Sequence, residues 1–314
     1  MSDPTLLAVL GATATGKSAL ALALAERWNG EIINCDSTAV YRGFDIGTDK
    51  VPMEERRGIP HHLIDIVEPT DIYTAARFAE DASRLAREIQ ARGRLPIVVG
   101  GTGLYYRALT RGLFPGPAAD DELRRRLERI AERRGNPFLH RMLARVDAPS
   151  AERIQKNDRK RMIRALEVFF VTGQPLTTHF ADTVSPTAGV RVIAVALQIA
   201  PELTAERVAR RVDQQFARGL LDEIRGLLAS GIPESARPFG GLVYRQALEY
   251  LHGVRDLAAT RDLIVRENRQ YAKRQRTWLR KEPDLEWFDG PGETPATIAA
   301  VTAALAPRLQ PNTF

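Results

Sequence analysis

The hydrophobic pattern of the first hundred residues alternates between short apolar runs and longer amphipathic segments. The short runs are rich in Leu, Ile and Val, which is typical of buried parallel strands. They cover residues 6–10, 31–35 and 95–99, and residues 190–197 add a further run. Residues 19–28 and 75–92 have the composition and spacing of helices. This alternation predicts an α/β fold with a doubly wound parallel sheet, whose functional loops lie at the carboxyl ends of the strands.

The pattern changes at about residue 115. Charged helical segments at 120–134 and 158–170 replace the alternation of strand and helix, which predicts a helical domain inserted at 115–189. The core then consists of residues 1–114 and 190–314, and we expect basic C-terminal helices in its second part. Breaks between those helices are expected near residues 231–238 and 283–289.

The composition is that of an ordinary globular protein, because 44% of the residues are hydrophobic and 27% are charged. No run approaches the roughly 20 apolar residues of a membrane span, and the first residues lack the blocks of a signal peptide, so we expect a cytoplasmic protein without a membrane partner. Cys35 is the single cysteine, which excludes an internal disulfide and a Cys-rich zinc module. The formal net charge of +6 and the basic stretch 266–281 favour a polyanionic partner.

The loop after the first apolar run matches the eight-residue P-loop pattern in full, between a predicted strand and a predicted helix. It comprises Gly11, Ala12, Thr13, Ala14, Thr15, Gly16, Lys17 and Ser18. Its glycines let backbone amides turn towards an anion, the helix amino terminus and Lys17 add positive charge, and Ser18 is a candidate ligand of Mg²⁺. The motif predicts a bound diphosphate, but hydrolase, kinase and transferase chemistry all remain open. Residues 63–66 are a poor match to the metal-binding strand of an energy-transducing NTPase, which argues against that class.

Several further blocks are more specific than the P-loop. They read DSTAVYRGFDIGTDK at 36–50, PHHLID at 60–65, GGTGLY at 100–105, RALEV at 164–168 and AKRQRTWL at 272–279. In sequence and in order they closely resemble the blocks of the tRNA dimethylallyltransferase family (the tRNA isopentenyltransferases), and the similarity extends from about residue 6 to residue 288. The chain departs from the family pattern at Ala39, where members often carry Gln, and at Asp49, where they often carry Ala. It also has Val243 before Tyr244 where the family has a Gly-Tyr pair.

The resemblance implies a P-loop NTPase-like core with an inserted helical domain that contacts tRNA. It implies transfer of the dimethylallyl group from dimethylallyl diphosphate to the exocyclic N6 amine of the adenine 3′-adjacent to the anticodon, in tRNAs that read codons beginning with U, with release of diphosphate. The partners are then the tRNA anticodon stem-loop and the prenyl donor, with Mg²⁺ as cofactor and no obligate protein partner, so we expect a monomer. An ATP-binding label would follow from the P-loop pattern, but we expect the diphosphate held in turnover to come from the prenyl donor.

Four residues match catalytic positions of the family. Asp36 is the candidate base for the attacking amine, and its place at the carboxyl end of a predicted strand puts it in the crevice of the P-loop. Arg211 is the candidate for stabilising the leaving diphosphate, and Thr13 and Thr102 are expected to line the donor and amine sides. The alternatives are a helix or turn cap for Asp36, a solvated helix charge for Arg211 and ordinary loop hydrogen bonds for the two threonines.

An adenine inside a stacked anticodon loop must be turned out to reach a buried diphosphate, which requires a large basic surface. Five cations at steps of three and four share one face of a predicted helix: Arg266, Arg269, Lys273, Arg276 and Arg280. We expect its other side, with Ile264, Tyr271 and Trp278, to pack against the core. The residues predicted to bind tRNA are Asp36, Ser37, Thr38, Ala39, Thr102, Arg124, Lys160, Arg161, Met162, Ile163, Arg164, Tyr244, Arg245, Arg269, Lys273 and Arg276. Solvated charged helix faces are the alternative for the basic residues among them.

Three other functions remain as rivals. A prenyltransferase acting on free adenine nucleotides, an adenylate isopentenyltransferase, would share the P-loop and the Asp36 motif, but the basic patches argue against it. A small-metabolite kinase would need a nucleotide adenine pocket, which no motif marks. A non-catalytic RNA-binding protein with a relict P-loop would have no reason to keep Lys17, Ser18 and Asp36 intact.

Overall fold

The computed structural model describes residues 4–114 and 116–309, which form two compact units. One unit consists of the chain up to residue 110 and from residue 186 onward, and the other of residues 111–185. The inserted unit therefore begins and ends four residues before the predicted boundaries of 115 and 189. Within the described residues no helix is both long and apolar enough to cross a membrane.

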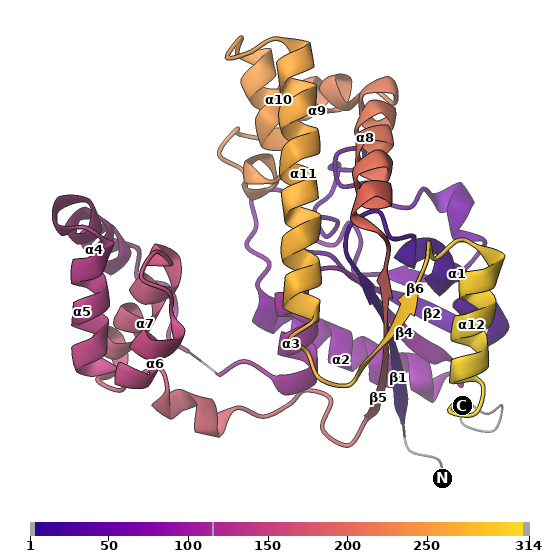
Figure 1. The fold of residues 1–314 in the computed structure, drawn as a ribbon, viewed down its shortest axis with the longest axis horizontal. Helices are drawn as coiled ribbons and strands as arrows, with labels where there is room; N and C mark the ends of the chain where they lie inside the picture. The colour runs from indigo at the N-terminus through magenta and orange to yellow at the C-terminus, as the bar shows by residue number, and fades with distance from the viewer. Residues whose placement is uncertain (1–3, 115, 310–314) are drawn as a thin grey trace. The chain divides into compact units, whose positions relative to one another are not determined.

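The larger unit is built on one six-stranded sheet in the order β3-β2-β4-β1-β5-β6 (Figure 1). All the paired strands run parallel. The strands are β1 Thr5–Gly11, β2 Gly30–Cys35, β3 His61–His62, β4 Leu95–Gly100, β5 Arg191–Gln198 and β6 Leu285–Asp289. Because β1 and β4 are buried on both faces, they read as continuous apolar runs. The carboxyl ends of β1, β2 and β4 lie together, and the loops that carry the P-loop, Asp36 and Thr102 follow them.

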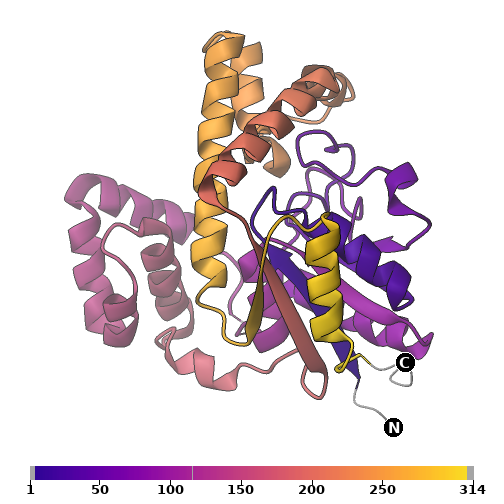
Figure 2. The same ribbon diagram turned by 45° about the vertical axis from the view of Figure 1, so that its right-hand side comes forward.

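The two faces of the sheet have separate hydrophobic cores, because side chains alternate along β1. Leu7 and Val9 face a core that α1 (Lys17–Arg27) and α12 (Pro295–Leu305) complete. Leu6, Ala8 and Leu10 face the other core, to which α2 (Ala75–Ala91) and α3 (Gly103–Arg111) contribute. The helices α8 (Pro201–Ala217), α9 (Leu220–Ala229) and α10 (Tyr244–Leu251) stand beyond the carboxyl ends of the strands, and α11 (Leu257–Leu279) runs from there down beside the sheet (Figures 1 and 2).

The inserted unit is helical. It contains α4 Asp121–Arg134, α5 Asn136–Val146, α6 Ala148–Arg153 and α7 Arg159–Thr172, and short 3₁₀ turns occur here and in the larger unit at Met53–Arg56, Thr178–Asp182 and Arg237–Gly240. Aspartate side chains cap three of these helices at the amino end, since Asp120, Asp147 and Asp158 each accept a backbone N–H of the first turn. Leu127, Leu139 and other apolar side chains of α4 to α7 form its own core.

The end of the chain differs from the prediction in two places. The predicted break between helices at 283–289 is confirmed, because α11 ends at Leu279 and α12 begins at Pro295, but within it Leu285–Asp289 forms the edge strand β6 beside β5, which was not predicted. Five residues flanked by Pro283 and Gly290 gave too short a pattern to recognise. Of the last two helices only α11 is basic, because α12 carries no charged residue and packs on the sheet.

Candidate active site

The P-loop leads from β1 into α1 in a conformation that glycine makes possible. Gly16 has a φ of 82° and caps the amino end of α1. A side chain at Gly16 would also collide with Glu293 and with the backbone N–H of Gly292, 2.7 Å away. The backbone of Gly292 donates to the carbonyl of Thr15 over 2.9 Å, so the segment after β6 braces the loop from outside.

Lys17 lies at the start of α1 as a half-buried cation. Burial first, and then the nearby charge of Arg211, lower the pKa of Lys17 to about 8, although the charges of Asp36 and Asp49 act in the opposite direction. These four side chains therefore share one electrostatic environment. An anion bound here would restore the affinity of Lys17 for its proton.

Asp36 sits in the turn after β2. Its Oδ1 accepts hydrogen bonds from the backbone N–H and the hydroxyl of Thr38, at 2.8 and 2.7 Å. Asp36 therefore does cap a turn, which was the alternative to its role as a base, but the cap uses only the Oδ1 oxygen. Within the described chain Oδ2 accepts no hydrogen bond. Thr102 lies next to this turn, because its hydroxyl accepts the backbone N–H of Ser37 over 3.2 Å.

A cavity of about 100 Å³ brings the predicted catalytic residues together. Thr13, Lys17, Ser18, Asp36 and Arg211 all line it, with Ala39 and Asp49. Arg211 comes from α8, and its side chain is 27% exposed. It is therefore not the solvated helix charge that was its alternative. Thr102 contacts the Asp36 turn without lining this cavity.

Two residues of α11 that the sequence did not mark as site residues tie this helix to the catalytic loops. The buried Gln275 accepts the backbone N–H of Thr13 over 2.8 Å and donates to the carbonyl of Gly101 over 3.0 Å. Burial and the charge of Asp36 raise the pKa of Tyr271 to about 12, although its hydrogen bonds with Thr102 and Gln275 act to lower this pKa. The place of Gln275 inside the 272–279 block was the available sequence signal for a role in the site. Its contacts with Thr13 and Gly101 could not be predicted, because they depend on the fold.

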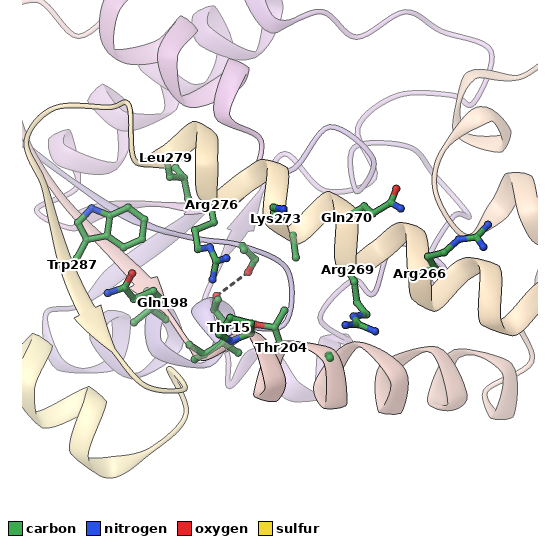
Figure 3. A pocket seen from close by; sticks show the side chains of 16 residues that line it. Thr15, Gln198, Thr204, Arg266, Arg269, Gln270, Lys273, Arg276, Leu279 and Trp287 are labelled. Atoms are coloured by element: carbon green, nitrogen blue, oxygen red, sulfur yellow. Dashed lines mark hydrogen bonds between the residues drawn. The ribbon is translucent and has the colours of Figure 1, made fainter.

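The outer face of the P-loop borders a second pocket, of about 410 Å³ (Figure 3). Leu197, Ile199, Leu279 and Trp287 supply an apolar floor. Four cations of α11 line it, and Figure 3 shows Arg269 and Arg276 reaching from this helix towards α8 and the loop: Arg266, Arg269, Lys273 and Arg276. Among the described residues these four have no ion-pair partner. The predicted basic face is therefore real over these positions, whereas Arg280 follows the end of α11 and lies outside the pocket lining.

The predicted tRNA-binding residues of the inserted unit differ in exposure. Met162 and Ile163 are 0% and 4% exposed in its core, so the prediction that their side chains contact tRNA is corrected. Arg124 holds both oxygens of the buried Glu167 at 2.8 and 3.0 Å, and Arg164 adds a third contact at 2.6 Å. Lys160 and Arg161 are exposed.

Tyr244 is also buried, at 2% exposure, which corrects its assignment to tRNA. Its hydroxyl donates to Glu223 and accepts the backbone N–H of Gly47 over 3.0 Å, and this arrangement raises its pKa through burial and the charge of Glu223. Arg245 is paired with Glu249 and Glu267. Val243, where the family has glycine, adopts a φ of 75°, a conformation that strains a β-branched residue.

Comparisons with known proteins agree with this arrangement. The family model described as IPP transferase matches residues 39–282. A tRNA dimethylallyltransferase of Geobacter metallireducens is 47% identical over 94% of this chain and 96% of its own, and one of Solibacter usitatus is 47% identical over 92% and 94%. Among solved structures, a full-length tRNA isopentenylpyrophosphate transferase from Bacillus halodurans is similar with a TM-score of 0.72 and 37% identity, covering 98% of this chain and 97% of that one.

A eukaryotic dimethylallyltransferase, solved in snapshots of its action on tRNA, is similar with a TM-score of 0.79 and 28% identity over 96% of this chain and 78% of that one. The matches span nearly the whole chain, including the P-loop, the Asp36 turn and α11. The chain belongs to the IPP transferase family, whose curated members are the tRNA dimethylallyltransferases.

Proposed function

We propose that this protein transfers the dimethylallyl group of dimethylallyl diphosphate to the exocyclic N6 amine of the adenine 3′-adjacent to the anticodon of tRNAs that read codons beginning with U. The observation that carries the proposal is the single cavity that Lys17, Ser18 and Arg211 share with Asp36. Groups that attract a diphosphate and a carboxylate able to take a proton lie in the same place. That pairing suits a displacement in which an amine attacks and a diphosphate leaves.

The leaving group needs positive charge where its own negative charge grows. Lys17, Arg211 and the amides at the start of α1 supply it from three directions. Because these groups are fixed before the reaction, they need no reorganisation as the bond breaks. The C–O bond of the allylic ester breaks towards them, and the diphosphate retains the electron pair.

The residues present also fit Mg²⁺. Ser18 lines the cavity beside the carboxylates of Asp36 and Asp49, and no cluster of three or more His, Cys, Asp or Glu suited to a metal occurs among the described residues. That is the environment expected for an ion held by one or two protein oxygens and by substrate phosphates. Ser18 would hold the ion, which would add positive charge beside the leaving oxygens.

The amine loses a proton as its nitrogen bonds to the allylic carbon. Thr38 fixes Asp36 through Oδ1 and leaves Oδ2 available to accept this proton. The charge of Asp36 is also the second cause, after burial, of the raised pKa of Tyr271. The tyrosine ring therefore lies near this carboxylate at the edge of the site. Asp36 is therefore an oriented base rather than only a turn cap.

The tRNA is bound by the four cations of α11 that line the pocket of Figure 3, together with Lys160 and Arg161 of the inserted unit. Lysines and arginines around a pocket with an apolar floor suit a single-stranded loop, which offers phosphates and unstacked bases together. A free nucleotide would need no cationic face of this extent. This feature favours tRNA over AMP, ADP or ATP as the acceptor.

The proposal is tested with labelled dimethylallyl diphosphate and Mg²⁺, offering unmodified tRNA, AMP, ADP or ATP in parallel. We expect label in tRNA alone. Asp36→Asn keeps the acceptor for Thr38 and removes the base, so it should lower the transfer rate by about 10² to 10⁴ with an unchanged unfolding temperature. Label in the free nucleotides alone would assign the chain to adenylate isopentenyltransferases, and no transfer to any acceptor would refute both.

A further inference from the structure

A carboxylate stands among the groups that bind the diphosphate. Asp49 lines the cavity of Lys17 and Arg211, and also the larger basic pocket of about 680 Å³ on the open side of the P-loop. Its Oδ2 lies 3.0 Å from Nε of Arg211, and its Oδ1 lies 3.6 Å from Arg218. A negative charge in an anion site requires an explanation, because it repels the ligand that the site binds.

The loop that carries Asp49 is fixed on both sides of it. Asp49 has a φ of 55°, which aspartate tolerates better than most residues, and its backbone N–H donates to Ile46. Side chains from other elements hold the residues around it. Glu223 accepts the N–H groups of Asp45 and Ile46, Tyr244 accepts that of Gly47, and Lys50 binds Tyr41, Asp45 and Asp65. Asp49 is thus a positioned charge and not a mobile surface carboxylate.

We propose that Asp49 is an internal counter-ion of Arg211 that competes with the diphosphate and so limits how tightly the site holds it. The inference rests on the proposed function for the identity of the anion. Without ligand, Arg211 pairs with Asp49. When the donor binds, its diphosphate replaces Asp49 as the ion-pair partner of Arg211. When the product diphosphate leaves, the pair between Asp49 and Arg211 forms again.

The chemistry gives this competition a purpose. Substrate and product present the same diphosphate group to the same cations, so a site that binds the donor tightly also retains its product. The Asp49 carboxylate acts as a competing anion at a constant effective concentration beside Arg211, because side chains from other elements hold its loop in place. It lowers the affinity for both diphosphates and favours release.

The test is diphosphate binding, measured by calorimetry on the full chain with Mg²⁺. Asp49→Asn keeps the size of the side chain and its tolerance for positive φ, and removes the charge. We expect the variant to bind inorganic diphosphate about three- to tenfold more tightly, with a similar fall in the KM for the donor. Glu54→Gln is the matched control, because Glu54 lines the larger pocket and loses the same charge without contacting Arg211.

A double-mutant cycle with Arg211→Gln identifies the route of the effect. If Asp49 acts through Arg211, Asp49→Asn changes diphosphate affinity little once Arg211 is gone. Unchanged or weaker diphosphate binding by Asp49→Asn, an equal gain in Glu54→Gln, or a gain that persists without Arg211 would each overturn the inference. A weaker response to Mg²⁺ in Asp49→Asn would overturn it in favour of a metal ligand. Calorimetry needs no tRNA, so failure of prenyl transfer with the predicted gain in affinity would refute the proposed function alone.

Discussion

The inserted unit and α11 both contain arginine-rich segments that the sequence predicts to bind tRNA, yet their cations have different surroundings. In the inserted unit, Arg124 and Arg164 both contact the buried carboxylate of Glu167. In α11, Lys273 and Arg276 line a pocket without an acidic partner among the described residues. Cations of the first kind hold a fold together, whereas cations of the second kind are available to an external anion. Counting basic residues cannot separate the two.

The largest effect is expected from removing the internal partner. Glu167→Gln removes the buried carboxylate that the partly exposed Arg124 and Arg164 share, and the weaker hydrogen bonds of the buried amide should cost about 2–3 kcal/mol of unfolding free energy. Chemical denaturation followed by circular dichroism measures it. The matched control is Glu128→Gln, which breaks the exposed pair with Arg159 and should cost less than about 1 kcal/mol. Equal losses in the two variants would contradict the distinction.

On α11 the corresponding change should affect tRNA and not the fold. Replacing Lys273 and Arg276 by alanine should weaken tRNA binding about 10- to 100-fold at low salt and reduce the slope of log affinity against log salt by about one to two. Filter binding over a salt series measures both. Alanine at Arg280 and Lys281 removes the same charge outside the pocket lining. If this control lost as much tRNA affinity as the variant lacking Lys273 and Arg276, the pocket would not be the site of tRNA binding on α11.

Gln275 tests whether one helix performs two separate tasks. Gln275→Ala removes the bridge between the loops of Thr13 and Gly101, so kcat should fall about 10- to 50-fold because misplaced reacting groups lose rate steeply. The affinity for tRNA should stay within about twofold, unlike that of the variant lacking Lys273 and Arg276. Thr277→Ala, which removes a hydroxyl that donates to the carbonyl of Lys273 in the same helix, should change neither. If Gln275→Ala also lost tRNA affinity, the face of α11 that carries Gln275 and the face that carries Lys273 and Arg276 would not act separately.

Lys17 is a third kind of cation, half-buried and without an ion-pair partner among the residues that the structure describes. Its pKa of about 8 means that the free enzyme has the cation below pH 8 and loses it above. Hence kcat/KM for the donor should be constant below pH 8 and fall about tenfold per unit above it, since the phosphate ionisation near pH 6 is already complete. Initial rates between pH 6.5 and 9.5 provide the profile. Lys17→Arg should abolish the decline, and a decline that persists in it would assign the titration to another group.

The smallest effect is expected at the exposed cations of the inserted unit. Alanine at Lys160 and Arg161 should lower tRNA affinity about two- to fivefold and leave stability within about 0.5 kcal/mol. The same filter-binding and denaturation assays apply, with Arg129→Ala of α4 as an exposed control of like charge. A loss as large as that at Lys273 and Arg276 would mean that the inserted unit shares equally in tRNA binding.

Local sequence determined much of the fold and the chemical identity of the site. Apolar runs and helical periods predicted four of the strands and the inserted helices α4 and α7, because continuous apolar runs and 3.6-residue periods are local signals. The P-loop and the Asp36 turn were readable for the same reason. Each follows directly from a strand, so the parallel sheet brings them to one edge.

Only the tertiary structure decided which charged and polar residues are free to act. Arg124 and Lys273 are both basic helix residues, but packing gives Arg124 a buried carboxylate, whereas Lys273 has no acidic partner in the part of the chain that the structure describes. Gln275 and Asp49 became site residues only because α11 and the loop before residue 50 reach the P-loop from distant parts of the chain. The short strand β6 forms because β5 offers it an edge. Such contacts join residues far apart in the sequence, and no local pattern records them.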